Sequence, residues 1–166
     1  MRNSTPFNTG EPLAYFLTWT TYGTWLPGDE RGWNRKGDSE PLSPSPLFKE
    51  MARSEMKEAA FVMSETSRLV VERTIQRHCV VRDWGLHALN VRTNHVHVVV
   101  SAGGNSPETV REQFKAWCTR GLKEVEAGRS RFWTEGGSCR WINLEAELEA
   151  VVLYVVEAQD RKGRVE

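Results

Sequence analysis

The sequence of 166 residues has little of several features that commonly classify a protein. Cysteine occurs only three times, with no C-x-x-C pair, which argues against a disulfide framework or a zinc cluster. No long uncharged apolar run is present, so no membrane span is expected. The first twelve residues lack the apolar segment of a signal peptide. We therefore expect a cytoplasmic chain with free thiols and no membrane contact.

The chain also carries no net charge at pH 7 with its histidines neutral. The 22 Lys and Arg residues balance 22 Asp and Glu residues, which excludes a globally basic nucleic-acid binder and leaves room only for a local basic patch. Disorder is not expected, because 39% of the residues are hydrophobic and seven are tryptophan. The length fits one domain, which we place over residues 13–163 after a flexible N-terminal arm over 1–12.

The residue pattern along the chain predicts alternating strands and helices. A Gly-, Pro- and Ser-rich stretch after the first strand predicts a long loop insertion over 23–53 that packs through its large apolar residues. The predicted elements are a strand over 13–22, a helix over 54–77, β-type runs over 78–83, 86–92 and 95–100, a helix over 106–126, a strand or hairpin over 131–142, and a helix over 143–159 capped by Asn143.

This order of elements is that of the split βαβ motif. We predict an α+β, ferredoxin-like (RRM-like) antiparallel sheet with helices on one face, plus a C-terminal helix. The same sheet serves as the scaffold of the RNA recognition motif, so the fold alone does not select a function.

The tripeptide His95-Val96-His97 is the sharpest chemical signal. Side chains alternate along a strand, so His95 and His97 point the same way, about 7 Å apart. Val96, Val98 and Val100 then point to the opposite, helix-covered face. Two adjacent imidazoles can bind one divalent cation, although a His-x-His tripeptide also occurs often by chance, as two half-exposed strand histidines without a metal.

The predicted last helix carries the other reactive side chains. Tyr154 lies in the apolar run 151–156, either as a core aromatic with its hydroxyl at the rim or as a nucleophile beside a bound cation. Glu157 and Gln159 follow it closely, and either is a candidate for a third metal ligand.

Residues 94–99, NHVHVV, resemble the HUH motif of single-tyrosine HUH transposases. The chain is most similar to the branch of REP-associated tyrosine transposases and their insertion-sequence relatives. Leu17–Gly32 resembles the N-terminal segment of that branch, and Phe132–Ser138 and the Tyr154 helix follow in the family's order. Four ordered segments thus carry a resemblance that spans most of residues 13–163.

The resemblance implies a metal-dependent, single-stranded-DNA endonuclease and strand transferase that acts on hairpin or repeat ends. In this family the two HUH histidines and a polar residue on the tyrosine helix hold Mg²⁺ or Mn²⁺, and the tyrosine attacks the scissile phosphate to give a 5′-phosphotyrosine. Carried over, His95 and His97 are metal ligands and Tyr154 is the nucleophile. Relatives act as monomers or as dimers, so a homodimer stays open.

One position departs from the family pattern. The family usually has Gln or Asn four residues after the tyrosine, where this chain has Ala158. In an α-helix Gln159 lies about 140° around from Tyr154, so it reaches the same site only if the helix contains a π-bulge or ends there. Glu157 lies about 60° away and is the alternative ligand. We place Gln159 first on chemical type.

Several cationic and aromatic residues are candidates for DNA contact. Solvated surface charge and packing of the long loop are their competing explanations, and Trp25 and Trp33 can likewise stack bases or pack the loop. The residues we assign to DNA binding are Arg31, Arg92, Arg131, Arg140 and Trp133. Two other functions compete: a DNA-binding module of the same fold with weak or no cleavage, and a small metallohydrolase that does not use Tyr154.

Overall fold

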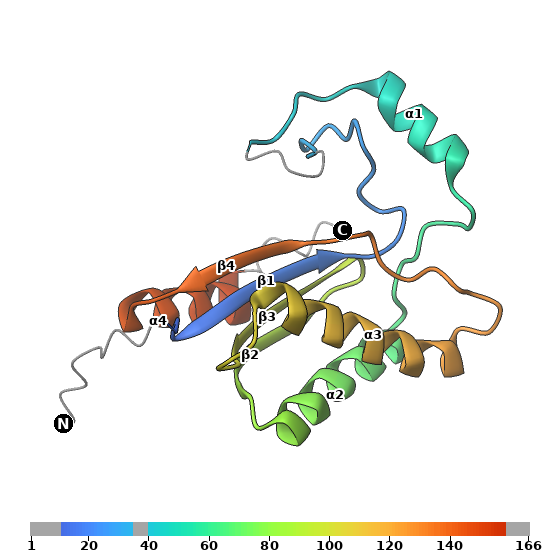
Figure 1. Ribbon diagram of the computed structural model, residues 1–166. Coiled ribbons are helices and arrows are strands. Elements are labelled where there is room, and N and C mark those ends of the chain that lie inside the picture. Colours follow the sequence, from blue (N-terminus) through green and yellow to red (C-terminus); the bar gives the residue numbers. More distant parts are fainter. Residues whose placement is uncertain (1–10, 35–39, 159–166) are drawn as a thin grey trace, which may run out of the picture.

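The computed structural model describes residues 11–34 and 40–158. Within these ranges one antiparallel sheet has the strand order β2-β3-β1-β4 (Figure 1). Helices α2 and α3 cover one face and α4 lies against the other, which confirms the predicted ferredoxin-like α+β fold. The elements are β1 (Ala14–Thr20), α1 (Pro46–Glu55), α2 (Glu65–Arg82), β2 (Gly85–Val91), β3 (His95–Ser101), α3 (Pro107–Val125), β4 (Ser138–Ile142), α4 (Glu145–Leu153) and the π-helical turn η1 (Tyr154–Ala158).

The alternation of side chains along β1 and β3 sorts the residues between the two faces. The alternate residues Leu17 and Trp19 of β1 are buried under α2 and α3, and Trp19 stacks on Phe114 with ring centroids 6.2 Å apart. In β3 the alternate valines, beginning with Val96, join the same core. The residues between them, His97 included, therefore face α4, as the two-residue period predicts.

Helices α2 and α3 begin at serine caps. Ser64 Oγ accepts a hydrogen bond from the Ser67 amide at 3.1 Å, and the predicted start at Ser106 is confirmed by the Thr109 amide, which donates to Ser106 Oγ at 3.2 Å. Such caps satisfy amide groups that have no partner within the helix. Helix α3 ends at Val125, close to the predicted end at residue 126, whereas α2 continues to Arg82, beyond the predicted end at residue 77.

Two secondary-structure predictions between residues 46 and 83 are wrong. The expected helix over 54–77 begins only at Glu65, because residues 54 and 55 are the end of α1 and residues 56–64 are irregular. The expected strand over 78–83 is the last turn of α2, where Val80 and Val81 are 81% and 71% exposed. These β-branched residues are typical of strands, yet here they lie on the solvent side of a helix, so their apolar character misleads a periodicity argument.

The long insertion forms what we call the arm, defined as residues 21–34 and 40–64. It leaves the end of β1 and carries α1 at its far end (Figure 1). The predicted loop over 23–53 is therefore partly helical. The prediction that its large apolar residues pack is confirmed by Trp33, whose ring lies 5.5 Å from that of Phe48 and whose Nε1 donates to the Ser43 carbonyl at 2.8 Å.

Helix α4 starts and ends differently from the prediction. Its N-cap is Leu144, with no side-chain cap hydrogen bond, so the expected cap at Asn143 is wrong. After Leu153 the backbone continues as η1. Val151 and Val155 are buried against the sheet in a second, smaller core that includes Val99.

Three further expectations concern the N-terminal segment, membrane spans and the cysteines. The flexible N-terminal segment predicted over 1–12 is distinct from the arm defined above, and its residues 1–10 lie outside the described residues. Over the described ranges, no helix has the length and apolar character needed to cross a membrane. Cys79, Cys118 and Cys139 are free thiols, as predicted.

Candidate functional site

The two histidines of β3 lie side by side beneath η1. Their ring centroids are 4.7 Å apart, with an angle of 78° between the planes. Thr18 Oγ1 and His97 Nδ1 share a hydrogen bond of 2.8 Å, and His95 Nδ1 donates to Asn94 Oδ1 at 2.6 Å. Contacts of this kind at Nδ1 orient the ring of a metal-binding histidine and set its tautomer, which directs Nε2 to the metal.

The electrostatic setting of His97 keeps its imidazole neutral. Burial, together with the neighbouring His95 and Arg92, lowers the pKa of His97 from its usual 6.5 to about 3. Burial disfavours the charged ring, and nearby positive charge acts in the same direction. The neutral imidazole is the form that donates a lone pair to a metal ion.

Tyr154 completes the cluster from the other side. It is the first residue of η1, and its ring centroid lies 6.4 Å from that of His97. Phe16 of β1 fills the space beside both, stacked on His97 at 5.5 Å and edge-on to Tyr154 at 6.4 Å. Tyr154 is 36% exposed, so it is accessible from solvent. The structure thus brings together His95, His97 and Tyr154.

The turn η1 is held to the sheet by one apolar and one polar contact. Val155 is fully buried, and its carbonyl accepts a hydrogen bond of 2.9 Å from Asn90 Nδ2. Asn90 lies on β2 directly opposite His97. The same strand pairing that places the histidine therefore also places the support of the tyrosine turn.

The π-helical winding bears on the third metal ligand. A π turn contains more residues than an α turn, so it brings the fifth residue after Tyr154 closer to its side and moves the third residue away. The structure shows π-helical winding over Tyr154–Ala158, but Gln159 itself lies outside the described residues. Glu157, the alternative, is exposed. Both assignments remain predictions.

The donor set fits a divalent cation only in part. Among the described residues no group of three or more His, Cys, Asp and Glu side chains is arranged to hold a metal ion. His95 and His97 supply two oriented imidazoles, which suit Mn²⁺ and other divalent ions that take their remaining ligands from amide, carboxylate, water or phosphate oxygen.

Two of the five residues predicted to contact DNA lie near this cluster. Arg92 occupies the β2–β3 turn, where its amide donates to the His95 carbonyl at 2.8 Å. Arg140 of β4 pairs in register with Phe16, which places it on the α4 face, and its Nη2 donates to Glu147 at 2.8 Å.

The structure does not bring Arg31 to the cluster. It lies in the arm, where its Nε donates to Asp29 Oδ1 at 2.7 Å and its Nη2 to Asp29 Oδ2 at 2.8 Å. Its guanidinium also covers the Trp25 ring, 4.0 Å from the centroid. The ion pair holds the pKa of Asp29 at about 2.

Arg131 and Trp133 line a different cleft, of about 810 Å³, between the arm and α3. Trp133 Nε1 donates to the Lys115 carbonyl at 3.2 Å and to Thr119 Oγ1 at 3.1 Å, and its ring packs edge-on against Trp19. These contacts explain Trp133 as a packing residue, in line with the alternative that the sequence left open for it.

Sequence reasoning missed three neighbours of the histidines: Phe16, Thr18 and Asn90. Each lies in a predicted strand, where the alternation of side chains predicts which residues of that strand share a face of the sheet. Their contact with His97 depends on the pairings Thr18 with His97 and Asn90 with His97, which no local signal specifies.

Comparison of the sequence with family models and with curated proteins finds no match. Solved structures share the fold. A REP-associated tyrosine transposase bound to a REP hairpin aligns with a TM-score of 0.55 and 14% identity, over 92% of this chain and 70% of that one. The crystal structure of a “putative transposase” from Deinococcus radiodurans R1 aligns with a TM-score of 0.50 and 13% identity, over 89% of this chain and 91% of that one.

Proposed function

We propose that this protein is a single-tyrosine HUH transposase: a metal-dependent single-stranded-DNA endonuclease and strand transferase acting on hairpin or repeat ends. The observation that carries the proposal is the convergence of His95, His97 and Tyr154, from β3 and η1, on one face of the sheet. The fold shared with a tyrosine transposase bound to a hairpin supports the same substrate class. The neutral charge of the whole chain is compatible with it, since contact with DNA needs only a local surface.

The histidine pair is the proposed site of Mg²⁺ or Mn²⁺, with Gln159, or alternatively Glu157, as a third ligand. When bound, the cation polarises the scissile phosphate and offsets negative charge that develops in the transition state. Thr18 and Asn94 act as positioning residues, because each fixes one imidazole ring through Nδ1.

Tyr154 is the proposed nucleophile. Its hydroxyl oxygen attacks the phosphorus, a bond forms between them, and the bond from phosphorus to the 3′ oxygen breaks. The phenolic proton is released, and the departing 3′ oxygen takes up a proton, which leaves a 3′-hydroxyl and a 5′-phosphotyrosine. One phosphodiester replaces another, so attack by a second 3′-hydroxyl joins the new strand and returns the tyrosine phenol without an energy source.

A covalent-adduct gel tests this function. Labelled single-stranded hairpin DNA from the flanks of the gene is incubated with the protein and Mn²⁺ or EDTA, then separated under denaturing conditions. We expect a shifted band that requires both metal and Tyr154. The chain has two other tyrosines, and Tyr22→Phe in the arm is a matched control that should retain the band.

The outcomes separate the competing functions. Binding without an adduct would favour a DNA-binding module and direct attention to Ala158. Metal-dependent cutting that survives Tyr154→Phe would favour a metallohydrolase. Either result contradicts the proposed transposase chemistry.

A further inference from the structure

A second cleft, of about 590 Å³, lies between the arm and the strands β1 and β4. The hydroxyl-bearing residues Thr18 and Thr20 of β1 and Ser138 of β4 are among its lining residues. Thr18 also belongs to the candidate site, since its Oγ1 shares the hydrogen bond with His97 Nδ1. Thr18 therefore borders both the cleft and the candidate site, and the volume of the cleft lies within the range of roughly 300–1,000 Å³ found for ligand sites.

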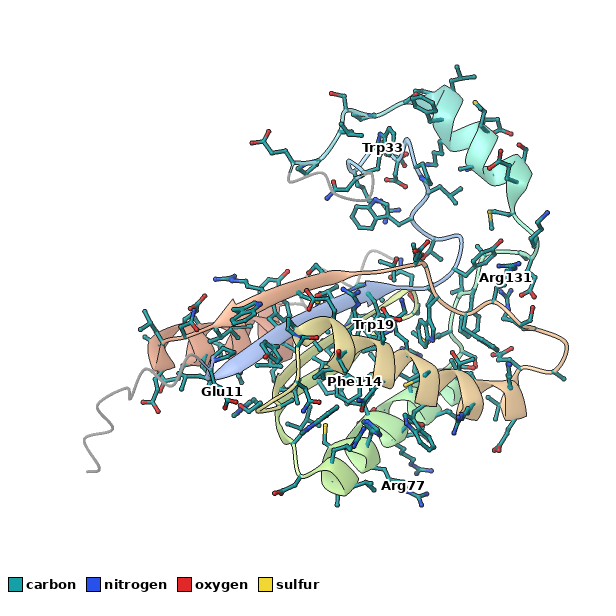
Figure 2. All side chains as sticks on the ribbon, in the orientation of Figure 1. Glu11, Trp19, Trp33, Arg77, Phe114 and Arg131 are labelled. Atoms are coloured by element: carbon teal, nitrogen blue, oxygen red, sulfur yellow. The ribbon has the colours of Figure 1, made fainter. Side chains whose placement is uncertain are left out.

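The arm supplies the opposite side of this cleft. Trp25, Arg31 and Trp33 line it, and Figure 2 shows Trp33 on the arm above the sheet that carries Trp19. Trp25 is 39% exposed and is fixed in place, because its Nε1 donates to the Gly32 carbonyl at 2.7 Å while Arg31 stacks on its ring. The aromatic side is thus held in position before any ligand binds.

The charges of the cleft favour a base over a phosphate. Arg31 is the cation among its lining residues, and it is ion-paired with Asp29; the lining also includes the carboxylate of Glu135. Such a balance offers little attraction to a polyanion. Planar aromatic and guanidinium groups instead stack with nucleobases of any sequence, and hydroxyl groups bond to their edges.

We propose that this cleft binds unpaired nucleotides of the single-stranded DNA that adjoins the scissile phosphate, with a base stacked on the Trp25–Arg31 pair. The inference rests on the proposed function, since it assigns the substrate strand of the same site. It gives the arm a role: the arm holds the strand beside β1 while Tyr154 reaches the phosphate.

The first test is an affinity measurement with a defined probe, fluorescein-labelled dT20, by fluorescence anisotropy. Trp25→Leu should weaken binding about tenfold, because one base stack on an aromatic ring is lost. The loss should be the same at low and high salt, since no phosphate contact is removed. Trp117→Leu is the matched control: Trp117 is 46% exposed and lies under Arg120 at 4.5 Å, but on α3, and its loss should change affinity less than twofold.

The second test does not depend on the folding of a variant. Wild-type protein is photocross-linked to oligothymidine carrying 5-iodouracil, and the modified peptides are mapped by mass spectrometry. We expect cross-links to Trp25 or Trp33. Cross-links confined to other parts of the chain, or equal losses of affinity in Trp25→Leu and Trp117→Leu, would overturn the cleft assignment. A Tyr154-dependent adduct would then still support the proposed function, whereas wild-type protein that neither binds dT20 nor forms an adduct would refute both.

Discussion

The support of the tyrosine turn can be tested by removing one hydrogen bond. Asn90→Ala deletes the donor that holds the Val155 carbonyl at 2.9 Å. A neutral hydrogen bond contributes about 1 kcal/mol net, so opening of η1 should become about fivefold more frequent. Val155 and Val151 keep their buried contacts with the sheet, so the global fold should persist. Tyr154 would be correctly placed for a smaller fraction of the time, and adduct formation should slow in proportion.

Hydrogen exchange measured by mass spectrometry reads this local opening directly. Amides of residues 154–158 should exchange about fivefold faster in Asn90→Ala, while those of α3 should not change. His87→Ala is a control on the same strand, because His87 bonds through Nε2 to Ser101 Oγ at 2.7 Å rather than to η1. Unchanged exchange over 154–158, or a uniform rise that includes α3, would refute the reasoning.

The remaining predictions concern the arm and the turn before β4. Because Arg31 lowers the pKa of Asp29 from 3.8 to about 2, the ion pair should contribute up to about 2 kcal/mol, fully present above pH 4 and lost as the pH falls towards 2. Tryptophan fluorescence should report an acid transition of the arm that Asp29→Asn lacks, and identical acid titrations of the two proteins would count against this account. Gly137→Ala should cost about 1–3 kcal/mol of unfolding free energy, since φ is +142° and a Cβ would lie 2.5 Å from the Thr18 carbonyl oxygen. Gly136→Ala, with positive φ but open space, should cost less in urea denaturation, and equal costs would disprove the steric argument.

The sheet could be predicted because burial follows a strict period in its central strands. In β3 the valines of one face are buried in the main core, while His95 and His97 share the other face. One short polar link then marks the hairpin between β2 and β3. Both features are local patterns of residue type, so they can be predicted from the sequence alone.

Prediction failed where apolar residues do not mark the main core. Leu47 and Met51 of α1 are largely exposed, and no residue of α1 is buried. The segment is therefore predicted as part of a loop, because its Gly-, Pro- and Ser-rich surroundings outweigh its helical pattern. At the end of α2, Val80 and Val81 imitate a strand because tertiary context overrides the β preference of valine.

In the candidate site, too, some features could be predicted from local patterns and others depend on the folded sheet. The face of the histidines and the position of Tyr154 on the last helix follow from local patterns. The contact of Thr18 with His97 and of Asn90 with η1 needs the register between strands distant in sequence, which is a property of the folded sheet. Helix geometry also predicted that Gln159 could reach the side of Tyr154 only through a π-bulge or a helix end, but the sequence could not show the π-helical winding over Tyr154–Ala158.

Peptide mapping of the covalent intermediate tests the central claim most directly. After reaction with single-stranded hairpin DNA and Mn²⁺, nuclease and trypsin digestion would leave a nucleotide remnant on the modified peptide. The account predicts this remnant on the tryptic peptide 141–161, in which Tyr154 is the only tyrosine. DNA cleaved with no remnant, or with the remnant on Tyr15 or Tyr22, would contradict it.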